Sequence, residues 1–174
     1  MRIFVALEPS ESFRAALGEL QARLKAAGVE GRYLAPANLH MTLAFIGEWP
    51  EDAAGALISP GKPFSVTLSG LGIFPKAKVL WAGVASSPEL NALAEQVRER
   101  LDVMGIPYDR QSFNPHITLA RKPVLPEEGI LSGIRIPEAG MTVRETCLYR
   151  SVREEEGMRY LVIGRSGERV EVES

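Results

Sequence analysis

The sequence predicts an α+β fold in which one strand-helix-strand unit is used twice. The 174 residues include only two histidines, and both stand in nearly the same phrase, NLHMTLA at 38–44 and NPHITLA at 114–120. Given one such phrase, Thr, Leu and Ala would follow the other histidine by chance roughly once in a thousand cases or fewer. The order of apolar patterns before both phrases is also the same, which indicates a duplicated unit that extends beyond the motif.

The first unit begins with a strand over residues 2–7, RIFVAL, which are almost entirely apolar. A helix follows, since Ser10 is a typical capping residue and Gly28 a typical helix stop. The apolar stripe of this helix consists of Phe13, Leu17, Leu20 and Leu24. A strand over 38–47, NLHMTLAFIG, completes the unit.

The second unit repeats this order, beginning with a strand over 79–84, VLWAGV. Two serines at 86–87 offer a helix cap, Pro88 suits the first helical turn and Gly105 is a stop. The apolar stripe consists of Leu90, Leu93, Val97 and Leu101. The strand 114–121, NPHITLAR, follows, and the first serine precedes its histidine by 30 residues, the same interval as in the first unit.

The remaining segments are expected to complete the sheets. Apolar and β-branched runs predict further strands over 64–71 and 141–151, and turn residues predict a hairpin of 159–163 with 169–172. Short helical stretches are expected over 51–57 and 127–131. The acidic run 154–156 is typical of a solvated turn, because adjacent carboxylates on a tight turn point apart and hold no metal.

Length and composition favour a single domain, 1–174, made of two pseudo-symmetric lobes that each contribute one His-x-Thr-x motif. With 45% hydrophobic residues the chain can bury a sizeable core. Residues 1–87 carry a net charge of +1 and the rest −3, which together give the overall −2. This balance excludes a protein that follows many phosphates along a nucleic acid, and leaves one that holds a terminus or a nucleotide.

Several features predict a cytoplasmic protein. Cys147 is the only cysteine, so no internal disulfide is possible, and its strand-like neighbours indicate a packed structural residue. The start MRIFVALEPS is too short and polar for a signal peptide, and no run is long enough to span a membrane. The sequence does not define the oligomeric state, and a monomer is the default expectation.

Strand geometry gives the repeated phrase a chemical meaning. Because alternate residues face opposite sides of a sheet, one face of the first motif should carry His40, Thr42 and Ala44, and the other Met41, Leu43 and Phe45. The second motif should likewise place His116, Thr118 and Ala120 on one face. If a pseudo-twofold axis relates the units, these faces meet across a cleft that holds two imidazoles and two hydroxyls.

Three other interpretations compete with a joint polar site. A lone strand histidine is usually structural, so two unrelated structural histidines are the first alternative. A zinc site would need further ligands, and neither a third histidine nor a cysteine near the motifs supplies them. A nucleophilic serine or cysteine would need an arrangement such as Gly-x-Ser-x-Gly, which is missing from the sequence. The matched His-Thr pairs favour the joint site.

With these motifs the chain resembles the 2H phosphoesterase superfamily, and within it the RNA 2′,3′-cyclic phosphodiesterases, historically called 2′-5′ RNA ligases. The resemblance rests on the opening MRIFVAL, on NLHMTLAFIG and FNPHITLAR, and on a late S-x5-G-x2-Y pattern at Ser151, Gly157 and Tyr160. It implies a bilobal, LigT-like α+β fold with antiparallel-rich sheets around a central cleft. The motifs then lie on central strands, and the site needs no metal or other cofactor.

The resemblance also implies a reaction, the hydrolysis of RNA 2′,3′-cyclic phosphodiester ends to 2′-phosphomonoesters. The partners would be RNA termini or nucleotides that bear the cyclic phosphate, and the historical name leaves reversible 2′-5′ ligation open. By the resemblance His40 is the proton donor to the leaving 3′ oxygen and His116 the proton acceptor from water. Histidine suits both roles because its ordinary pKa lies near neutrality, and Thr42 and Thr118 can donate to the oxygens where charge builds.

Three further residues are candidates for substrate binding. Arg121 follows the second motif and could pair with the phosphate, although strict alternation points it away unless the strand ends or twists there. Tyr33 stands before the first motif, where family members often have a stacking Trp, and Tyr160 belongs to the late pattern. The alternative function is a non-catalytic RNA-end or nucleotide-binding module on the same fold.

Overall fold

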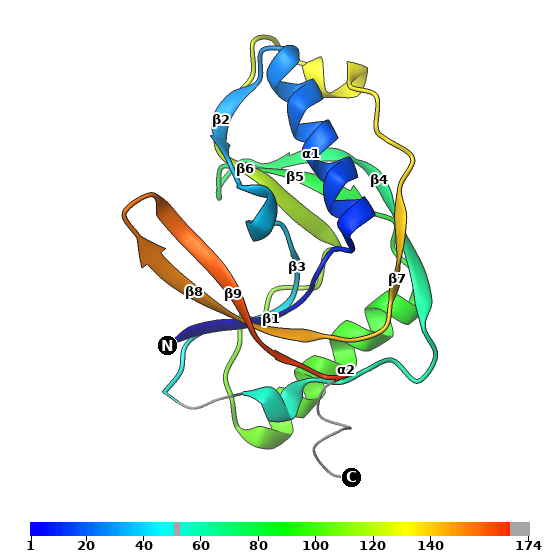
Figure 1. Cartoon of the computed structure of the whole chain (residues 1–174), viewed down its shortest axis with the longest axis vertical. Coiled ribbons are helices and arrows are strands. Elements are labelled where there is room, and N and C mark those ends of the chain that lie inside the picture. Colours follow the sequence, from blue (N-terminus) through cyan, green and yellow to red (C-terminus); the bar gives the residue numbers. More distant parts are fainter. Residues whose placement is uncertain (51–52, 168–174) are drawn as a thin grey trace.

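Two antiparallel sheets form the framework of the protein (Figure 1). The computed structural model describes residues 1–50 and 53–167. The four-stranded sheet has the order β3-β1-β8-β9 and the five-stranded sheet β2-β6-β5-β4-β7. The strands are β1 (Arg2–Leu7), β2 (Glu30–Tyr33), β3 (Met41–Glu48), β4 (Phe64–Phe74), β5 (Val79–Val84), β6 (His116–Val124), β7 (Gly140–Val143), β8 (Cys147–Glu154) and β9 (Gly157–Arg165). The helices are α1 (Glu11–Ala26) and α2 (Pro88–Met104), with 3-10 turns at η1 (Pro36–Asn38), η2 (Ala54–Ala56) and η3 (Ile130–Gly133).

The two predicted strand-helix-strand units are confirmed as β1-α1-β3 and β5-α2-β6. In both, the two strands pair directly with each other and run antiparallel. Ser10 caps α1 by accepting from the Phe13 amide, whereas α2 is capped by Ser87, one residue later than the repeat interval. Gly105 ends α2 with φ 71°, a left-handed conformation that glycine adopts without strain.

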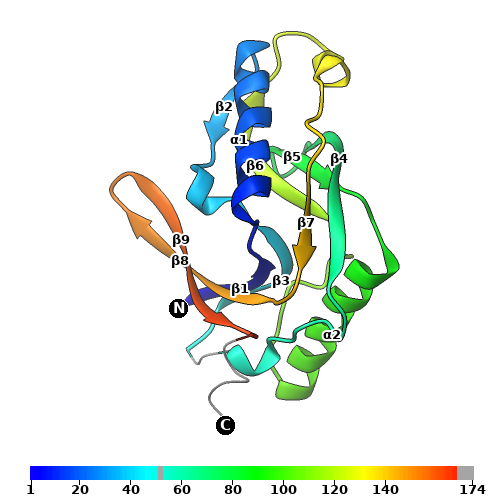
Figure 2. The same cartoon turned by 45° about the vertical axis from the view of Figure 1, so that its right-hand side comes forward.

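Each helix packs on the sheet of the other unit (Figures 1 and 2). Helix α1 lies over the five-stranded sheet, where the buried Gln21 amide donates to the carbonyls of Leu34 and Leu119, both at 3.0 Å. Helix α2 lies against β3, and Arg98 Nε donates to the Leu43 carbonyl at 3.1 Å. The two helices are thus exchanged between the units, and one continuous apolar core joins both sheets.

Replacing Gln21 by Leu should lower the free energy of unfolding by about 1–3 kcal/mol. The variant removes the amide that satisfies two carbonyls in a buried setting, and a buried polar group without its partner costs about this much. Urea unfolding of the variant measures the change, with Gln96→Leu on the exposed face of α2 as the matched control. Equal stability of the two variants would contradict a structural role for the Gln21 amide.

The predicted strand over 141–151 is wrong, because the chain changes sheets within it. β7 belongs to the five-stranded sheet and β8 to the four-stranded one. Between them the buried Thr146 hydroxyl accepts from the Ile58 amide at 3.0 Å and donates to its carbonyl at 2.9 Å. These bonds attach the segment between β7 and β8 to the loop that contains Ile58, and not to a neighbouring strand. An apolar pattern in the sequence gives no sign that a strand is interrupted in this way.

The C-terminal hairpin also differs from the prediction. Residues 159–163 do form a strand, as part of β9, but β9 pairs with β8 through the turn before Gly157. The predicted partner strand, 169–172, lies outside the described residues. The short helices are 3-10 turns at η2 and η3, with residues 51–52 outside the description, and β2 has no counterpart in the prediction.

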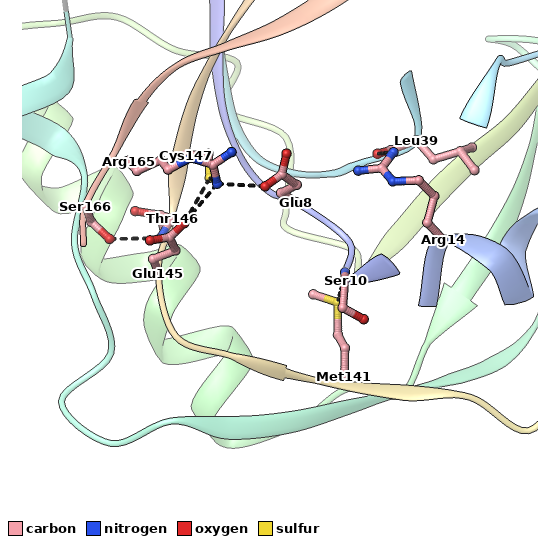
Figure 3. A network of polar contacts seen from close by, with 10 residues as sticks. All are labelled: Glu8, Ser10, Arg14, Leu39, Met141, Glu145, Thr146, Cys147, Arg165 and Ser166. Atoms are coloured by element: carbon pink, nitrogen blue, oxygen red, sulfur yellow. Dashed lines mark hydrogen bonds and ion pairs between the residues drawn. The ribbon is translucent and has the colours of Figure 1, made fainter. Parts of the chain in front are cut away.

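A polar network joins the ends of β1, β8 and β9 (Figure 3). Arg165 donates to Glu8 at 2.6 Å and to Glu145 at 3.0 Å, so one guanidinium links three segments distant in sequence. Beside it Cys147 is buried, and burial raises the pKa of its thiol to about 12. Cys147 is therefore a protonated, packed residue, as predicted. In the described part of the chain no helix is long and apolar enough to cross a membrane.

Candidate active site

A register shift interrupts the first motif at its leucine. Along the pair β1 and β3, Ala6 lies opposite Thr42, but the next residue, Val5, lies opposite Ala44. Leu43 is therefore an extra residue in β3, as in a β-bulge, and it reverses the faces of Ala44 and Phe45. A second shift follows between Phe45, which lies opposite Phe4, and Gly47, which lies opposite Ile3.

The bulge corrects the predicted faces of this strand. Ala44 does not share the face of Thr42, because it lies opposite Val5 and both are fully buried in the main core. Phe45, expected in the core, lies opposite Phe4 and lines the same cavity as Thr42. The alternation of side chains between the two faces fails here because one extra residue, Leu43, is inserted in the strand.

The second motif has the same shift at the equivalent leucine. Thr118 lies opposite Trp81, whereas Ala120 lies opposite Leu80, so Leu119 is the extra residue. Ala120 is turned into the core, contrary to the prediction. Arg121 is turned to the face of Thr118, where it lines the cavity. Strict alternation would point Arg121 away from the site, and the bulge at Leu119 turns it toward the cavity.

The motif faces meet at two cavities that share the lining residues Thr42 and Phe45. One cavity, of about 700 Å³, is bounded by the first motif, by the end of the second and by β8 and β9. Its lining includes His40, Thr42, Thr118, Arg121 and Tyr160. The other, of about 660 Å³, contains His116. The structure thus brings together six of the seven predicted site residues. Among the described residues, no group of three or more His, Cys, Asp or Glu side chains could hold a metal ion.

Both histidines are held in the same tautomer. His40 Nδ1 lies 2.7 Å from the carbonyl oxygen of Asn38, and His116 Nδ1 lies 2.6 Å from that of Asn114. A carbonyl oxygen can only accept, so each Nδ1 carries the hydrogen. Nε2 is therefore the nitrogen of each ring that can exchange a proton with a substrate.

His40 lies in an aromatic enclosure. The centroid of its ring lies 4.7 Å from that of Phe4, 5.4 Å from Tyr149 and 5.1 Å from Tyr160, whose ring meets it edge-on. The pKa of His40 is lowered to about 4, mainly by burial and to a smaller extent by the nearby positive charge of Arg121, against the opposing effect of the Asn38 carbonyl. Without a bound anion, His40 is neutral at pH 7.

His116 has aromatic neighbours of its own. Phe74 meets its ring edge-on at 4.9 Å, and Trp81 lies at 6.5 Å. The Trp81 indole in turn lies so close to Gly72 that a Cβ there would come within 2.1 Å of the ring. Gly72 therefore permits the position of the indole that stands beside His116.

A histidine titration followed by NMR should separate the two rings. We expect the His40 resonance to titrate with a midpoint near pH 4, because burial disfavours its charged form. Inorganic phosphate should move this midpoint upward, since a bound anion stabilises the imidazolium. His40→Gln assigns the resonance, and a midpoint near the ordinary value of about 6.5 would contradict the enclosed position of the ring.

Asn38 is a site residue that the sequence interpretation missed. Its side-chain amide donates to the Met158 carbonyl at 2.9 Å, and its side-chain oxygen accepts from the Tyr160 amide at 3.1 Å. Its backbone carbonyl holds His40. Asn38 thus ties β9, which carries Tyr160, to the catalytic candidate. An asparagine two residues before each histidine was the signal in the sequence.

Tyr33 is the predicted site residue that the structure does not bring to the cavities. It lies opposite Ala120 and packs against the main core. Its hydroxyl donates to the Val29 carbonyl at 2.7 Å, and the Lys25 ammonium lies 4.8 Å from the ring centroid. The position of Tyr33 supports a packing role.

Two matched His-Thr pairs from duplicated units converge in this fold, and this arrangement is the one that the resemblance to the 2H phosphoesterases predicts. The family model of the 2′-5′ RNA ligase superfamily matches residues 9–155, and the chain belongs to this superfamily. Among curated relatives, the RNA 2′,3′-cyclic phosphodiesterase of Thermotoga maritima is 29% identical, with 94% of this chain and 93% of the relative covered. The enzyme of the same name from Thermus thermophilus is 32% identical, with 94% and 88% covered.

Solved structures show the same fold. The crystal structure of E. coli LigT complexed with 3′-AMP matches with a TM-score of 0.73 and 29% identity, covering 94% of this chain and 95% of that one. The crystal structure of TT0787 of Thermus thermophilus matches with a TM-score of 0.71 and 31% identity, covering 95% and 96%. The predicted LigT-like α+β fold is confirmed.

Proposed function

We propose that the protein hydrolyses RNA 2′,3′-cyclic phosphodiester ends to 2′-phosphomonoesters, using the two histidines as acid and base. The observation that carries the proposal is the matched presentation of two imidazoles, each with Nδ1 fixed by a backbone carbonyl and Nε2 available for proton transfer. The names of the curated relatives support the substrate class. Binding alone would not need two rings held in this way.

In the proposed reaction His116 Nε2 accepts a proton from water while the water oxygen bonds to phosphorus. The bond between phosphorus and the 3′ oxygen breaks, and His40 Nε2 donates a proton to that oxygen. The products are a 2′-phosphate and a 3′ hydroxyl. If a 5′ hydroxyl attacks phosphorus in place of water, the same displacement of the 3′ oxygen forms a 2′-5′ linkage, the ligation that the superfamily name describes.

The charge of the substrate bears on how His40 can act as the proton donor. His40 is neutral in the ligand-free protein and must gain a proton to act as the donor. Burial is the main cause of the lowered pKa, and a phosphodiester anion beside Arg121 stabilises the imidazolium against it and offsets the neighbouring positive charges. Substrate binding and protonation of His40 are therefore coupled, and the donor is formed in the complex.

Thr42, Thr118 and Arg121 form the proposed phosphate-binding wall. All three line the cavity that contains His40. Hydroxyl and guanidinium hydrogens directed at the non-bridging oxygens stabilise the charge that grows on them in the transition state. Tyr160, edge-on to His40, is proposed as part of the wall that contacts the terminal nucleotide.

We further propose that the chain works as one domain and as a monomer in the cytoplasm. The exchanged helices and the continuous core support a single domain. A monomer suffices because one chain supplies both histidines. The cytoplasm remains a proposal from the sequence.

Incubation with a 2′,3′-cyclic nucleotide in excess EDTA tests the function. We expect ring opening to proceed at the same rate with and without the chelator, because the proposed acid, base and anion-binding groups are all side chains. Tight binding without turnover would replace the enzyme by the nucleotide-binding module. Loss of activity in EDTA would overturn the two-histidine mechanism.

A further inference from the structure

The cavity that contains His40 holds more positive charge than one cyclic phosphate requires. Its lining includes Arg2, Arg121, Arg150 and Arg153, with Glu48 as the carboxylate. Glu48 accepts from the terminal amine of Met1 at 3.2 Å. The whole chain has a net charge of −2, so this surface concentrates cations that the overall composition conceals.

Arg2 and Arg153 extend away from His40 along the four-stranded sheet. Phe4 and Tyr149 lie opposite each other and contact the His40 ring. Arg2 is two residues from Phe4 on the same face of β1, which is about 7 Å farther from the histidine. It lies opposite Ser151, and Arg153 lies about 7 Å beyond that on the same face of β8.

These guanidinium groups are available to bind an anion. In the described part of the chain neither Arg2 nor Arg153 forms an ion pair, and both are exposed. The Arg2 guanidinium lies 5.0 Å from the centroid of Phe45, a residue shared by the two cavities. The ring holds Arg2 at the cavity wall while leaving its hydrogen-bond donors for a ligand.

We infer that Arg2 and Arg153 form a subsite for the internucleotide phosphodiester that precedes the cyclic end. The inference rests on the proposed function and specifies its substrate as an RNA strand of at least two nucleotides. A mononucleotide carries only the cyclic phosphate, which occupies the wall of Thr42, Thr118 and Arg121. A dinucleotide adds one phosphodiester next to the cyclic end, and two guanidinium groups on the same sheet face can donate to its oxygens. Two such arginines are too few to follow a long strand, which agrees with the expectation that the protein binds the end of an RNA.

Turnover of two substrates with the same cyclic end tests the subsite. The substrates are uridine 2′,3′-cyclic phosphate and the dinucleotide UpU with a 2′,3′-cyclic phosphate, each measured as kcat/KM. The natural protein should prefer the dinucleotide by about tenfold or more, because only the longer substrate can make the charge-assisted contacts to the added phosphodiester. Arg2→Gln and Arg153→Gln should each reduce the ratio of the two kcat/KM values several-fold, and the double variant should bring it near one.

Arg100→Gln is the matched control, because Arg100 is exposed on α2, does not line the cavity and loses the same charge. Its ratio should equal that of the natural protein. Increasing salt should weaken the dinucleotide preference with a slope of about 0.7 for the one added phosphodiester, and this slope should approach zero when both arginines are removed. An equal fall of the ratio in Arg100→Gln would overturn the subsite in favour of a general charge effect.

The two proposals fail in different ways. Equal kcat/KM for both substrates in the natural protein would refute the subsite and leave the hydrolase intact. No turnover of either substrate would refute the hydrolase. In that case the affinities for UpU with a terminal 2′-phosphate and for uridine 2′-phosphate, measured by calorimetry, decide the subsite. The subsite is supported if the natural protein binds the dinucleotide more tightly and Arg153→Gln binds both ligands equally. Equal affinities in the natural protein overturn the subsite.

Discussion

His40→Ala and His116→Ala should each lower the turnover of a 2′,3′-cyclic end by about 10²- to 10⁴-fold, and the double variant should lose little more. General acid-base catalysis contributes about this factor. The two rings act at opposite ends of one displacement, so removing either disables the same step and the losses do not add. Single-turnover rates of the three variants measure the effect.

A substrate whose leaving group needs no proton distinguishes the two roles. It should restore the rate of His40→Ala, which lacks the donor, and not that of His116→Ala, which lacks the base. Rescue of His116→Ala instead would keep the mechanism and reverse the assignment. Because His40 packs against Phe4 and Tyr149, thermal unfolding of each variant serves as the control for folding. Near-normal turnover in either single variant would make the paired motif a remnant of duplication.

Thr42→Val and Thr118→Val should each lower kcat by about tenfold to a thousandfold, with a smaller change in KM. Valine keeps the shape of threonine and removes the hydroxyl donor, and loss of one donor to a developing oxyanion costs about 2.7–4 kcal/mol at the upper end of this range. The stabilisation arises in the transition state, so it is expressed mainly in kcat.

Thr67→Val provides the comparison for the threonine variants, because Thr67 is an exposed residue of β4 that does not line either cavity. It undergoes the same chemical change and should retain full activity. Unchanged turnover in both Thr42→Val and Thr118→Val would mean that these hydroxyls serve the structure of the strands.

The local patterns of the sequence predict the two units well. The helices follow from capping serines, apolar stripes and glycine stops, which act within a few residues of one another. The repeated motif predicts that two histidines and two threonines converge, because duplication preserves geometry as well as sequence. Arg121 and Tyr160 also line the cavity that contains His40, Thr42 and Thr118.

Other features depend on contacts that no local pattern marks. The bulges at Leu43 and Leu119 are invisible, since leucine is equally suited to a regular strand, and they decide where Phe45 and Arg121 point. The aromatic enclosure of His40 is assembled from three other strands, so its lowered pKa is a tertiary property. The division of 141–151 between two sheets depends on the bond of Thr146 to Ile58, far away in the chain.

The exchange of helices between the units bears on the ancestry of the fold. A solitary strand-helix-strand segment of this kind would extend its helix away from its own strands and leave the apolar face of those strands in water. Two identical copies could each cover the other, as α1 and α2 now cover opposite sheets. The ancestral segment would therefore have been viable as a symmetric homodimer with one histidine from each chain. In the present protein one chain carries both copies, and their imidazoles differ, since His40 is enclosed by three aromatic rings and His116 is more open.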